Sequence, residues 1–286
     1  MQGHAGDGIL LVSKPIGMSS HDVVEQIRRS PVGLRRKVGH AGTLDPFATG
    51  LLIIVIGKAT RVQRFFMSLP KTYRTRARFG LRSDTGDPTG NLTETGQRVD
   101  EGTIGTALPG LRGDIQQKVP LTSAVKVGGE RLYRKARRGE EADTPVRQVT
   151  VSRLELCQFD AEAQAGVLEI ECSSGTYVRQ LITDLGELCG AGAYCETLER
   201  LAIGPFDVED ADAQRLIPLS SALEFLPVRR LEPAEARRAR HGGAVAAGEL
   251  GGTKPADVVR LVADGELIAV AECRDDLLKP VAVLSS

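Results

Sequence analysis

Tryptophan is absent from this chain, and aromatic residues make up only 4% of its 286 positions. Hydrophobic residues still account for 41%, so we expect a sizeable core of leucine, valine, isoleucine and alanine. No apolar run approaches the ~20 residues that a membrane-spanning helix needs. The polar start MQGHAGDG also lacks the apolar stretch of a signal peptide. These absences predict a cytoplasmic protein with no membrane partner.

Cysteine occurs five times, without a Cys-x-x-Cys pair and without a histidine at ligand spacing. A zinc site is therefore not expected, and the odd number of thiols fits a reducing compartment. The glycine-rich signatures of dinucleotide and nucleoside-triphosphate sites are missing as well, as is the G-x-S-x-G elbow of hydrolases. The sequence thus predicts neither a metal nor an organic cofactor.

The formal net charge is zero, which by itself gives no sign of a nucleic-acid partner. The basic residues are nevertheless segregated. Five lie without an acid between Arg28 and Lys37, six without an acid between Arg61 and Arg78, and six beside a single glutamate from Lys126 to Arg138. One such run alone is best explained as an ordinary solvated face. Three runs beside glycine-rich loops make contact with phosphate groups an equally good explanation.

Hydrophobic periodicity predicts both strands and helices, without a regular βαβ alternation. Strands are expected over 9–12, 51–56, 73–79, 148–159, 166–172 and 197–203. Helices are expected over 58–69, 132–138 and 177–188. A further helix is expected to begin at the capping box formed by Ser19 and Asp22. This mixture predicts an α+β fold with a mostly antiparallel sheet.

Composition shifts near residue 226. Beyond it the sequence predicts a helix over 235–241 and strands over 258–262, 267–271 and 280–284. We therefore expect a large domain over residues 1–226 and a small β-rich module over residues 227–286.

Asp45 is the most conspicuous candidate for chemistry. It lies in GHAGTLDPFATGLL (39–52), a loop of glycines and small residues followed by an apolar strand. Taken alone, an Asp-Pro step between apolar segments is most simply a turn. A carboxylate on such a loop can also act as a nucleophile or a general base, because a rigid scaffold holds it in place.

A second segment, SSGTYVRQL (173–181), combines a strand end, a glycine turn and the start of a helix. Tyr177 and Arg179 are expected in the first turn of that helix. By themselves they are most simply a packing residue and a surface residue. The guanidinium of Arg179 has the planar donor geometry that pairs with a carboxylate or a phosphate.

Five blocks in this order resemble the bacterial tRNA pseudouridine-55 synthase family, and the resemblance extends from Leu10 to about Leu226. The blocks are GHAGTLDPFATGLL, KTYRTRARFG, SDTGDPTG, SAVKVGGERLYRKARRGEE and SSGTYVRQL. The resemblance implies a pseudouridine-synthase fold, in which helices flank a mixed, mostly antiparallel central sheet. The C-terminal module is similar, more weakly, to a PUA-type RNA-binding module.

The resemblance implies a stand-alone enzyme that isomerises uridine 55 of the tRNA T-loop to pseudouridine without metal, redox cofactor or ATP. It assigns Asp45 as the nucleophile and Arg179 as the partner of the carboxylate. Tyr73 is the tyrosine that stacks on the target base, with a role in proton removal from the ring as a second possibility. The expected partner is the T-stem-loop of tRNA, and the expected state is a monomer that needs no protein partner.

Further residues are assigned to the substrate by the same resemblance. His40 matches the histidine that takes the space of the flipped base, Tyr177 matches an aromatic of the pocket, and residues 126–138 match an arm that closes over the T-loop. The implied substrate contacts are His40, Gly42, Tyr177, Lys14, Leu201, Arg134, Lys135 and Arg137. The chain departs from the family at Ser13, where an aspartate is frequent, and at Glu199, where an arginine is frequent.

Three other functions stay open on the sequence. The chain could be a non-catalytic RNA-binding protein or tRNA chaperone on the same scaffold, a guide-RNA-dependent pseudouridine synthase, or a glycosyl hydrolase. A hydrolase generally needs a second carboxylate, for which Asp84 and Asp184 are the candidates. The residues do not decide whether Asp45 attacks the sugar or the uracil ring.

Overall fold

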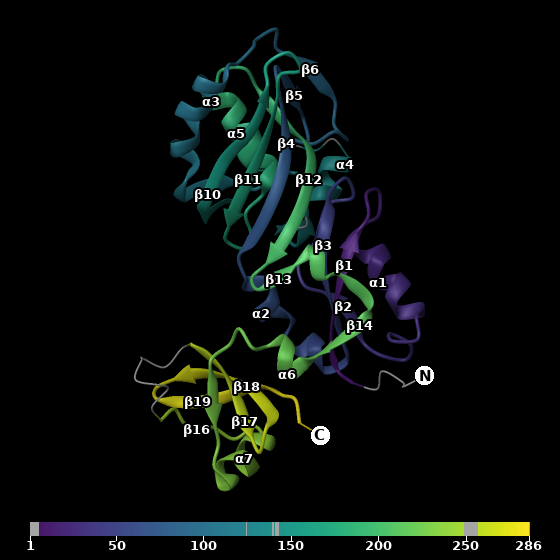
Figure 1. The fold of residues 1–286 in the computed structure, drawn as a ribbon, viewed down its shortest axis with the longest axis vertical. Coiled ribbons are helices and arrows are strands. Elements are labelled where there is room, and N and C mark those ends of the chain that lie inside the picture. Colours follow the sequence, from purple (N-terminus) through teal and green to yellow (C-terminus); the bar gives the residue numbers. More distant parts are fainter. Residues whose placement is uncertain (1–5, 124, 139, 141–142, 249–256, 286) are drawn as a thin grey trace.

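The computed structural model describes residues 6–123, 125–138, 140, 143–248 and 257–285. A large sheet runs along the elongated body, and a smaller sheet forms a separate module at the C-terminal end (Figure 1). Helices and strands are mixed along the chain in both parts. The predicted α+β class is therefore confirmed.

The large sheet contains ten strands. They are β1 (Gly8–Lys14), β2 (Val38–His40), β3 (Thr49–Ile56), β4 (Lys71–Phe79), β7 (Gly113–Lys118), β10 (Val146–Asp160), β11 (Ala165–Cys172), β12 (Ala193–Ile203), β13 (Phe206–Asp207) and β14 (Asp212–Pro218). The order is β14-β1-β3-β12-β4-β11-β10-β7, with β2 beside β3 and β13 beside β12. Within the described strands, β3 and β12 run parallel and the other neighbours run antiparallel, which confirms the mixed, mostly antiparallel sheet.

β3 is the central strand of the lower half of this sheet. Its even positions pack on the helix α1 (Ser20–Arg29) and its odd positions pack on the opposite side, against α2 (Gln63–Ser68) and α6 (Leu219–Ala222). A strand buried on both faces has no polar face, which explains its continuous apolar run. The rigid strand then fixes the loop that precedes it, which carries Asp45.

The sheet has two halves that meet between β3 and β12. The upper half consists of β12, β4, β11, β10 and β7, and the lower half of β1, β2, β3 and β14 (Figure 1). Thr49 pairs with Glu199 and Gly50 with Arg200, and the ladder between the halves contains these two residue pairs. Beyond them β3 pairs with β2 instead. The sheet therefore opens along one edge of β3.

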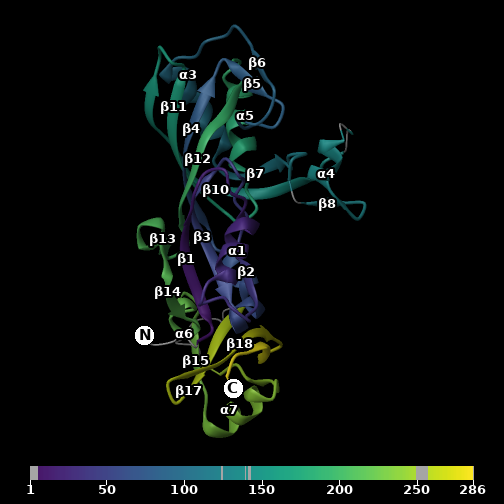
Figure 2. The same cartoon turned by 90° about the vertical axis from the view of Figure 1, so that its right-hand side faces the viewer.

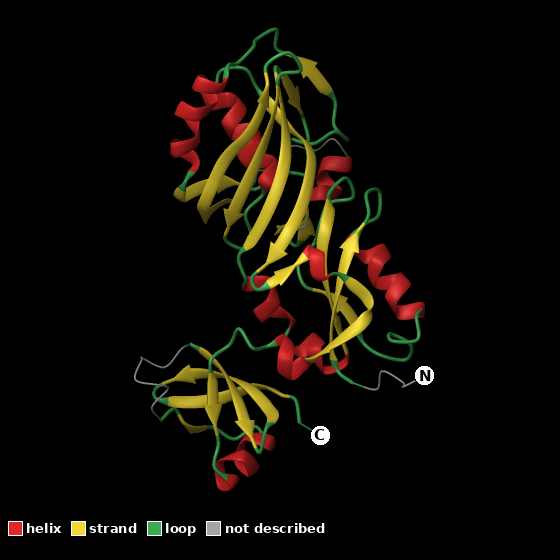
Figure 3. Cartoon of the chain, in the orientation of Figure 1, coloured by secondary structure: helices red, strands yellow, loops and turns green. Residues whose placement is uncertain are grey.

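Helices α3 (Glu101–Ala107) and α5 (Val178–Leu188) cover one face of the upper half (Figure 3). The predicted capping box is present, because Ser19 and Asp22 bond each other reciprocally at the start of α1. The single helix expected over 58–69 is wrong. A short 3-10 turn over Gly57–Arg61 and α2 are separated at Val62, whose φ of −111° and ψ of 8° are not helical.

The upper half carries two further features. A hairpin of β5 (Leu81–Ser83) and β6 (Leu92–Glu94) carries most of the SDTGDPTG block in its loop. An arm formed by the described residues between 120 and 144 projects from the body and carries β8 (Lys126–Val127), β9 (Glu130–Arg131) and α4 (Leu132–Arg137) (Figure 2).

The C-terminal module packs against the lower half. Its described residues form five strands and a helix. The strands are β15 (Val228–Arg230), β16 (Val245–Ala246), β17 (Val258–Ala263), β18 (Glu266–Arg274) and β19 (Leu277–Val283), and the helix is α7 (Pro233–Arg240). Val270, Ala282 and Leu284 join the core of the lower half, and Arg64 pairs with Glu272 at 2.6 Å. The module is therefore docked and not merely tethered.

We predict that Gly50→Ala destabilises the protein by more than about 1 kcal/mol. Gly50 has a φ of +100°, and an added Cβ would lie 2.3 Å from the Arg200 carbonyl oxygen. The methyl group would push β12 away from β3. Urea unfolding measures the change. The matched control is Gly105→Ala in α3, which meets no atom within 4 Å and should be stabilising. Equal effects of the two substitutions would contradict this account of the junction.

Candidate active site

The loop that carries Asp45 is held from three sides. The Ala41 amide donates to Ile53 at 2.8 Å, so the loop continues the β2–β3 pairing. The buried hydroxyl of Ser20, at the start of α1, lies 2.8 Å from the Leu44 amide and 3.1 Å from its carbonyl oxygen. The Gly17 amide donates to the Pro46 carbonyl at 2.7 Å. These bonds fix the backbone on both sides of the carboxylate.

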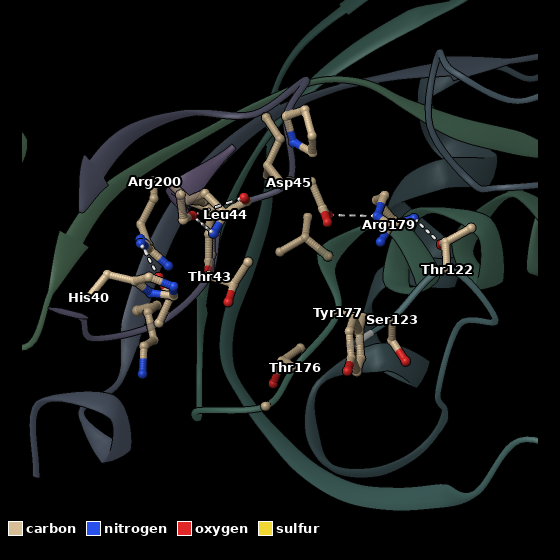
Figure 4. A pocket seen from close by; sticks show the side chains of 18 of the residues that line it. His40, Thr43, Leu44, Asp45, Thr122, Ser123, Thr176, Tyr177, Arg179 and Arg200 are labelled. Carbon is tan, nitrogen blue, oxygen red and sulfur yellow. Dashed lines mark hydrogen bonds and ion pairs between the residues drawn. The ribbon is translucent and has the colours of Figure 1, made fainter. Parts of the chain in front are cut away.

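Arg179 forms the ion pair that orients Asp45. Its Nε lies 2.9 Å from Asp45 Oδ2, and Figure 4 shows the two side chains meeting across one end of the pocket. The Arg179 side chain is 3% exposed, whereas 36% of the Asp45 side chain remains open. The pair therefore has a buried cation and a carboxylate that a substrate can reach.

A second carboxylate, Asp87, binds the other side of the same guanidinium. Its Oδ2 accepts from Arg179 Nη1 at 3.0 Å, while its Oδ1 accepts from Thr85 Oγ1 and from the amide and hydroxyl of Thr89. Asp87 lies in the loop between β5 and β6 and is buried. This loop therefore serves to anchor Arg179.

Burial raises the pKa of Asp45 above the ordinary aspartate value. The positive charge of Arg179 acts in the opposite direction, and the negative charge of Asp87 adds to the increase. Arg179 is thus shared between two carboxylates, so it compensates the Asp45 charge only in part.

The pocket beside Asp45 has a volume of about 820 Å³. Its walls come from α1, the Asp45 loop, β4, β12, the arm and the start of α5. The lining includes His40, Gly42, Lys71, Tyr73, Ser123, Arg131, Tyr177, Leu198 and Arg200. The predicted residues Asp45, Tyr73, Arg179, His40, Gly42 and Tyr177 are thus brought together around one cavity.

Burial favours the neutral forms of two ring side chains of the pocket, Tyr73 and His40. Burial raises the pKa of the Tyr73 phenol, and it lowers the pKa of the His40 imidazole. His40 Nδ1 is buried and has no hydrogen-bond partner among the described residues. Tyr177 precedes α5 instead of lying in its first turn, and its backbone is bonded by the Gln117 amide. Neutral rings of this kind suit a flat, neutral ligand.

Arg200 fills the place where the sheet opens, and sequence reasoning gave it no role. Its Nε donates to the Leu51 carbonyl at 2.7 Å, and its Nη2 donates to the Gly42 carbonyl at 3.0 Å. Gly42 has a φ of +102°, and a Cβ added to it would lie 3.6 Å from Arg200 Nη1. The Arg200 side chain thus supplies hydrogen bonds where backbone bonds between β3 and β12 end. It also brings a positive charge to the wall of the pocket (Figure 4).

Lys71 was also not predicted, although it opens the same KTY segment as Tyr73. It lines the pocket, and its ammonium group donates to the carbonyls of Met67 and Leu69. Burial lowers its pKa to about 8. Asp87 and Arg200 could be recognised from sequence only as a carboxylate in SDTGDPTG and a basic residue in a strand.

Several predicted substrate contacts lie elsewhere. The Lys14 ammonium is buried behind the Asp45 loop, where it donates to the carbonyls of Pro15, Met18 and Pro46. It therefore supports the loop in this structure. Leu201 is on β12 but outside the pocket lining. Arg134, Lys135 and Arg137 are on α4 of the arm, and the side chain of Arg137 lies outside the described part of the structure.

The candidate second carboxylates also lie elsewhere. Asp84 bonds Asn91, and Asp184 accepts from the Gln180 amide at 2.8 Å. The acid that shares Arg179 with Asp45 is Asp87. Within the described residues, no cluster of three histidine, cysteine or acidic side chains could hold a metal ion, and no helix is long and apolar enough to cross a membrane.

Comparison with known proteins finds relatives of this chain. A family model described as the N-terminal domain of the TruB family pseudouridylate synthases matches residues 29–178. The chain is 39% identical to the tRNA pseudouridine synthase B of Thermobifida fusca (strain YX), over 98% of this chain and 99% of the relative. It is 37% identical to the protein of that name from Arthrobacter sp. (strain FB24), over 97% and 96% of the two chains.

Solved structures share the fold. An H/ACA RNP bound to a substrate RNA containing 2'-deoxyuridine aligns with a TM-score of 0.73 at 21% identity, over 98% of this chain and 85% of that one. A Cbf5-Nop10-Gar1 complex aligns with a TM-score of 0.72 at 24% identity, over 98% and 84%. The full-length relatives and the matched domain identify the chain itself: it belongs to the TruB family of pseudouridylate synthases.

Proposed function

We propose that this chain converts uridine 55 in the T-loop of tRNA to pseudouridine, with Asp45 as the nucleophile and with no cofactor, guide RNA or protein partner. The observation that carries the proposal is the Asp45–Arg179 pair at 2.9 Å, beside an 820 Å³ pocket that Tyr73 also lines. The curated relatives named tRNA pseudouridine synthase B, which match nearly the whole chain, support tRNA as the substrate.

The reaction is an isomerisation and needs no external reagent. The N1–C1′ bond of the uridine breaks and a C5–C1′ bond forms, while the hydrogen on C5 leaves as a proton and N1 gains one. Asp45 holds the intermediate covalently, either at C1′ or on the ring. The detached uracil must stay in the pocket, where the Tyr73 ring stacks on it. Burial raises the pKa of the Tyr73 phenol and so keeps it protonated. This favours stacking over proton removal from the ring as the role of Tyr73.

The target base must first leave the folded T-loop, which costs a few kcal/mol. We assign His40 to the space that the base vacates, because its neutral ring lies at the wall of the pocket. The basic residues of the arm, Arg134, Lys135 and Arg137, hold backbone phosphates as the arm closes over the loop. The C-terminal module serves as a PUA-type RNA contact, and the enzyme works as a cytoplasmic monomer.

A guide-RNA-dependent function is the second candidate, because the complexes with TM-scores of 0.73 and 0.72 have the same fold. Their identities of 21% and 24% are well below the 37–39% of the bacterial relatives. The basic arm gives this chain its own means of holding RNA. The intact Asp45, Tyr73 and Arg179 argue against a purely non-catalytic chaperone.

We predict that Asp45→Asn abolishes product formation, with a loss of at least about 10⁴-fold, because the amide is not a nucleophile. The assay uses unmodified tRNA tritiated at uracil C5, without guide RNA, and measures released tritium. Binding of the tRNA should remain. Asp184→Asn removes a carboxylate outside the pocket and is the matched control. Full activity of Asp45→Asn would refute the nucleophile, and free uracil would indicate a hydrolase.

We expect the rate at saturating tRNA to fall as the pH drops through the raised pKa of Asp45, since only the carboxylate attacks. Asp87→Asn removes a negative charge that contributes to this increase. The acid limb should therefore move to lower pH, while the rate at neutral pH falls because Arg179 loses an anchor. A pH–rate profile tests both effects. An acid limb that stays in place in Asp87→Asn would contradict the shared guanidinium.

We predict that the triple substitution of Arg134, Lys135 and Arg137 by alanine weakens tRNA binding and lowers the slope of log K against log salt by about 2. The control replaces by alanine Arg82, Arg153 and Arg274, which lie outside the three basic runs and form ion pairs with glutamates. This control removes the same formal charge. If both triples lower the slope equally, the effect is one of net charge and the arm does not contact the phosphates.

A further inference from the structure

The base of the arm is attached to the start of α5 at two points. The Gln117 amide bonds the backbone of Tyr177 in both directions, at 3.0 and 2.7 Å. Five residues further along the chain, the Thr122 hydroxyl accepts a hydrogen bond from Arg179 Nη1 at 2.6 Å (Figure 4). The second attachment thus joins the arm directly to the guanidinium that orients Asp45.

Arg179 Nη1 has more acceptors than hydrogens. It carries two hydrogens, yet three oxygens lie within hydrogen-bond distance: the Thr85 carbonyl at 2.9 Å, Asp87 Oδ2 at 3.0 Å and Thr122 Oγ1 at 2.6 Å. Nε is directed separately to Asp45. The three acceptors therefore compete, and the Thr122 hydroxyl, the nearest of them, weakens the bond between Nη1 and Asp87.

The arm is not close-packed on the body at this point. A cavity of about 220 Å³ lies between residues 83–86, α5 and the two ends of the arm, and Thr122 and Thr144 both line it. The Thr144 hydroxyl is buried and has no partner among the described residues. The Thr122 side chain thus borders open space and makes a polar contact with Arg179.

We propose that Thr122 is a positioning residue, whose hydroxyl sets how Arg179 is divided between Asp45 and Asp87 and so couples the arm to the catalytic carboxylate. This inference rests on the proposed function of the Asp45 site. Thr122 also lines the substrate pocket, but its proposed role concerns its contact with Arg179. It acts through Arg179 alone.

Removal of the hydroxyl has a defined consequence. In Thr122→Val the two Nη1 hydrogens satisfy Thr85 and Asp87, so no group is left unpaired and the fold should persist. The guanidinium moves toward Asp87 and compensates the Asp45 charge less well. The ionisable groups that face Asp45 from the surrounding elements are Arg179, Asp87, Lys14, Tyr73 and Cys195. Thr122→Val changes none of their identities.

The first experiment does not depend on activity. Carbon-13 NMR of the full-length protein, labelled at aspartate carboxyl carbons, follows the titration of Asp45, which Asp45→Asn identifies. We expect the pKa of Asp45 to rise by about 0.5 in Thr122→Val and to be unchanged in Thr122→Ser, which keeps the hydroxyl. Thr183→Val is the matched control, because Thr183 lines the same cavity but bonds only the Arg179 carbonyl. An unchanged Asp45 titration in Thr122→Val overturns the proposal.

The second experiment measures tritium release and tRNA binding by the same variants. Thr122→Val should lower the rate at saturating tRNA about tenfold and move the acid limb to higher pH, with the Kd for tRNA unchanged. Thr122→Ser should restore both. A weaker Kd with an unchanged rate would make Thr122 an RNA contact and overturn the positioning role. If the wild-type protein released no tritium, the proposed function would fail, and the NMR titration would still decide the role of Thr122.

Discussion

The buried guanidinium of Arg179 is the constraint on which the active site depends. A buried cation is stable only where several oxygens compensate it, and removing one partner of such a pair is strongly destabilising. Asp45, Asp87, Thr85 and Thr122 supply these oxygens from three separate segments. One side chain therefore holds three segments in position relative to one another: the β5–β6 loop, the base of the arm and the Asp45 loop.

Sequence patterns predicted a strand or helix correctly where its residues have the same surroundings along the whole element. The buried run at 51–56 and the capping box at Ser19 were predicted, and both are present. The prediction of one helix over 58–69 is wrong at Val62, because hydrophobic periodicity does not reveal a change in backbone conformation at a single residue. The short edge strand β14 and the helix α3 were missed, since few apolar residues mark them.

In the active site, the resemblance to known sequences named Asp45, Tyr73 and Arg179, and the fold brings all three to one pocket. Physical reasoning on the residues alone did not find Asp87 or Arg200. Their roles come from contacts across 92 residues, to Arg179, and across 149 residues, to Leu51. Lys14 shows the opposite case, because its place in a motif suggested a substrate contact while its ammonium is occupied by backbone carbonyls.

The parallel junction between β3 and β12 also matters during synthesis. Leu51 emerges from the ribosome 149 residues before Arg200, its partner across the open edge of β3. At typical translation rates of about 5–20 residues per second this interval is about 8–30 s. Throughout it the most apolar strand of the protein has an incomplete edge, and unpaired strand edges invite association with other chains. The nascent enzyme is thus most vulnerable to aggregation before β12, the last long strand of the large sheet, is made.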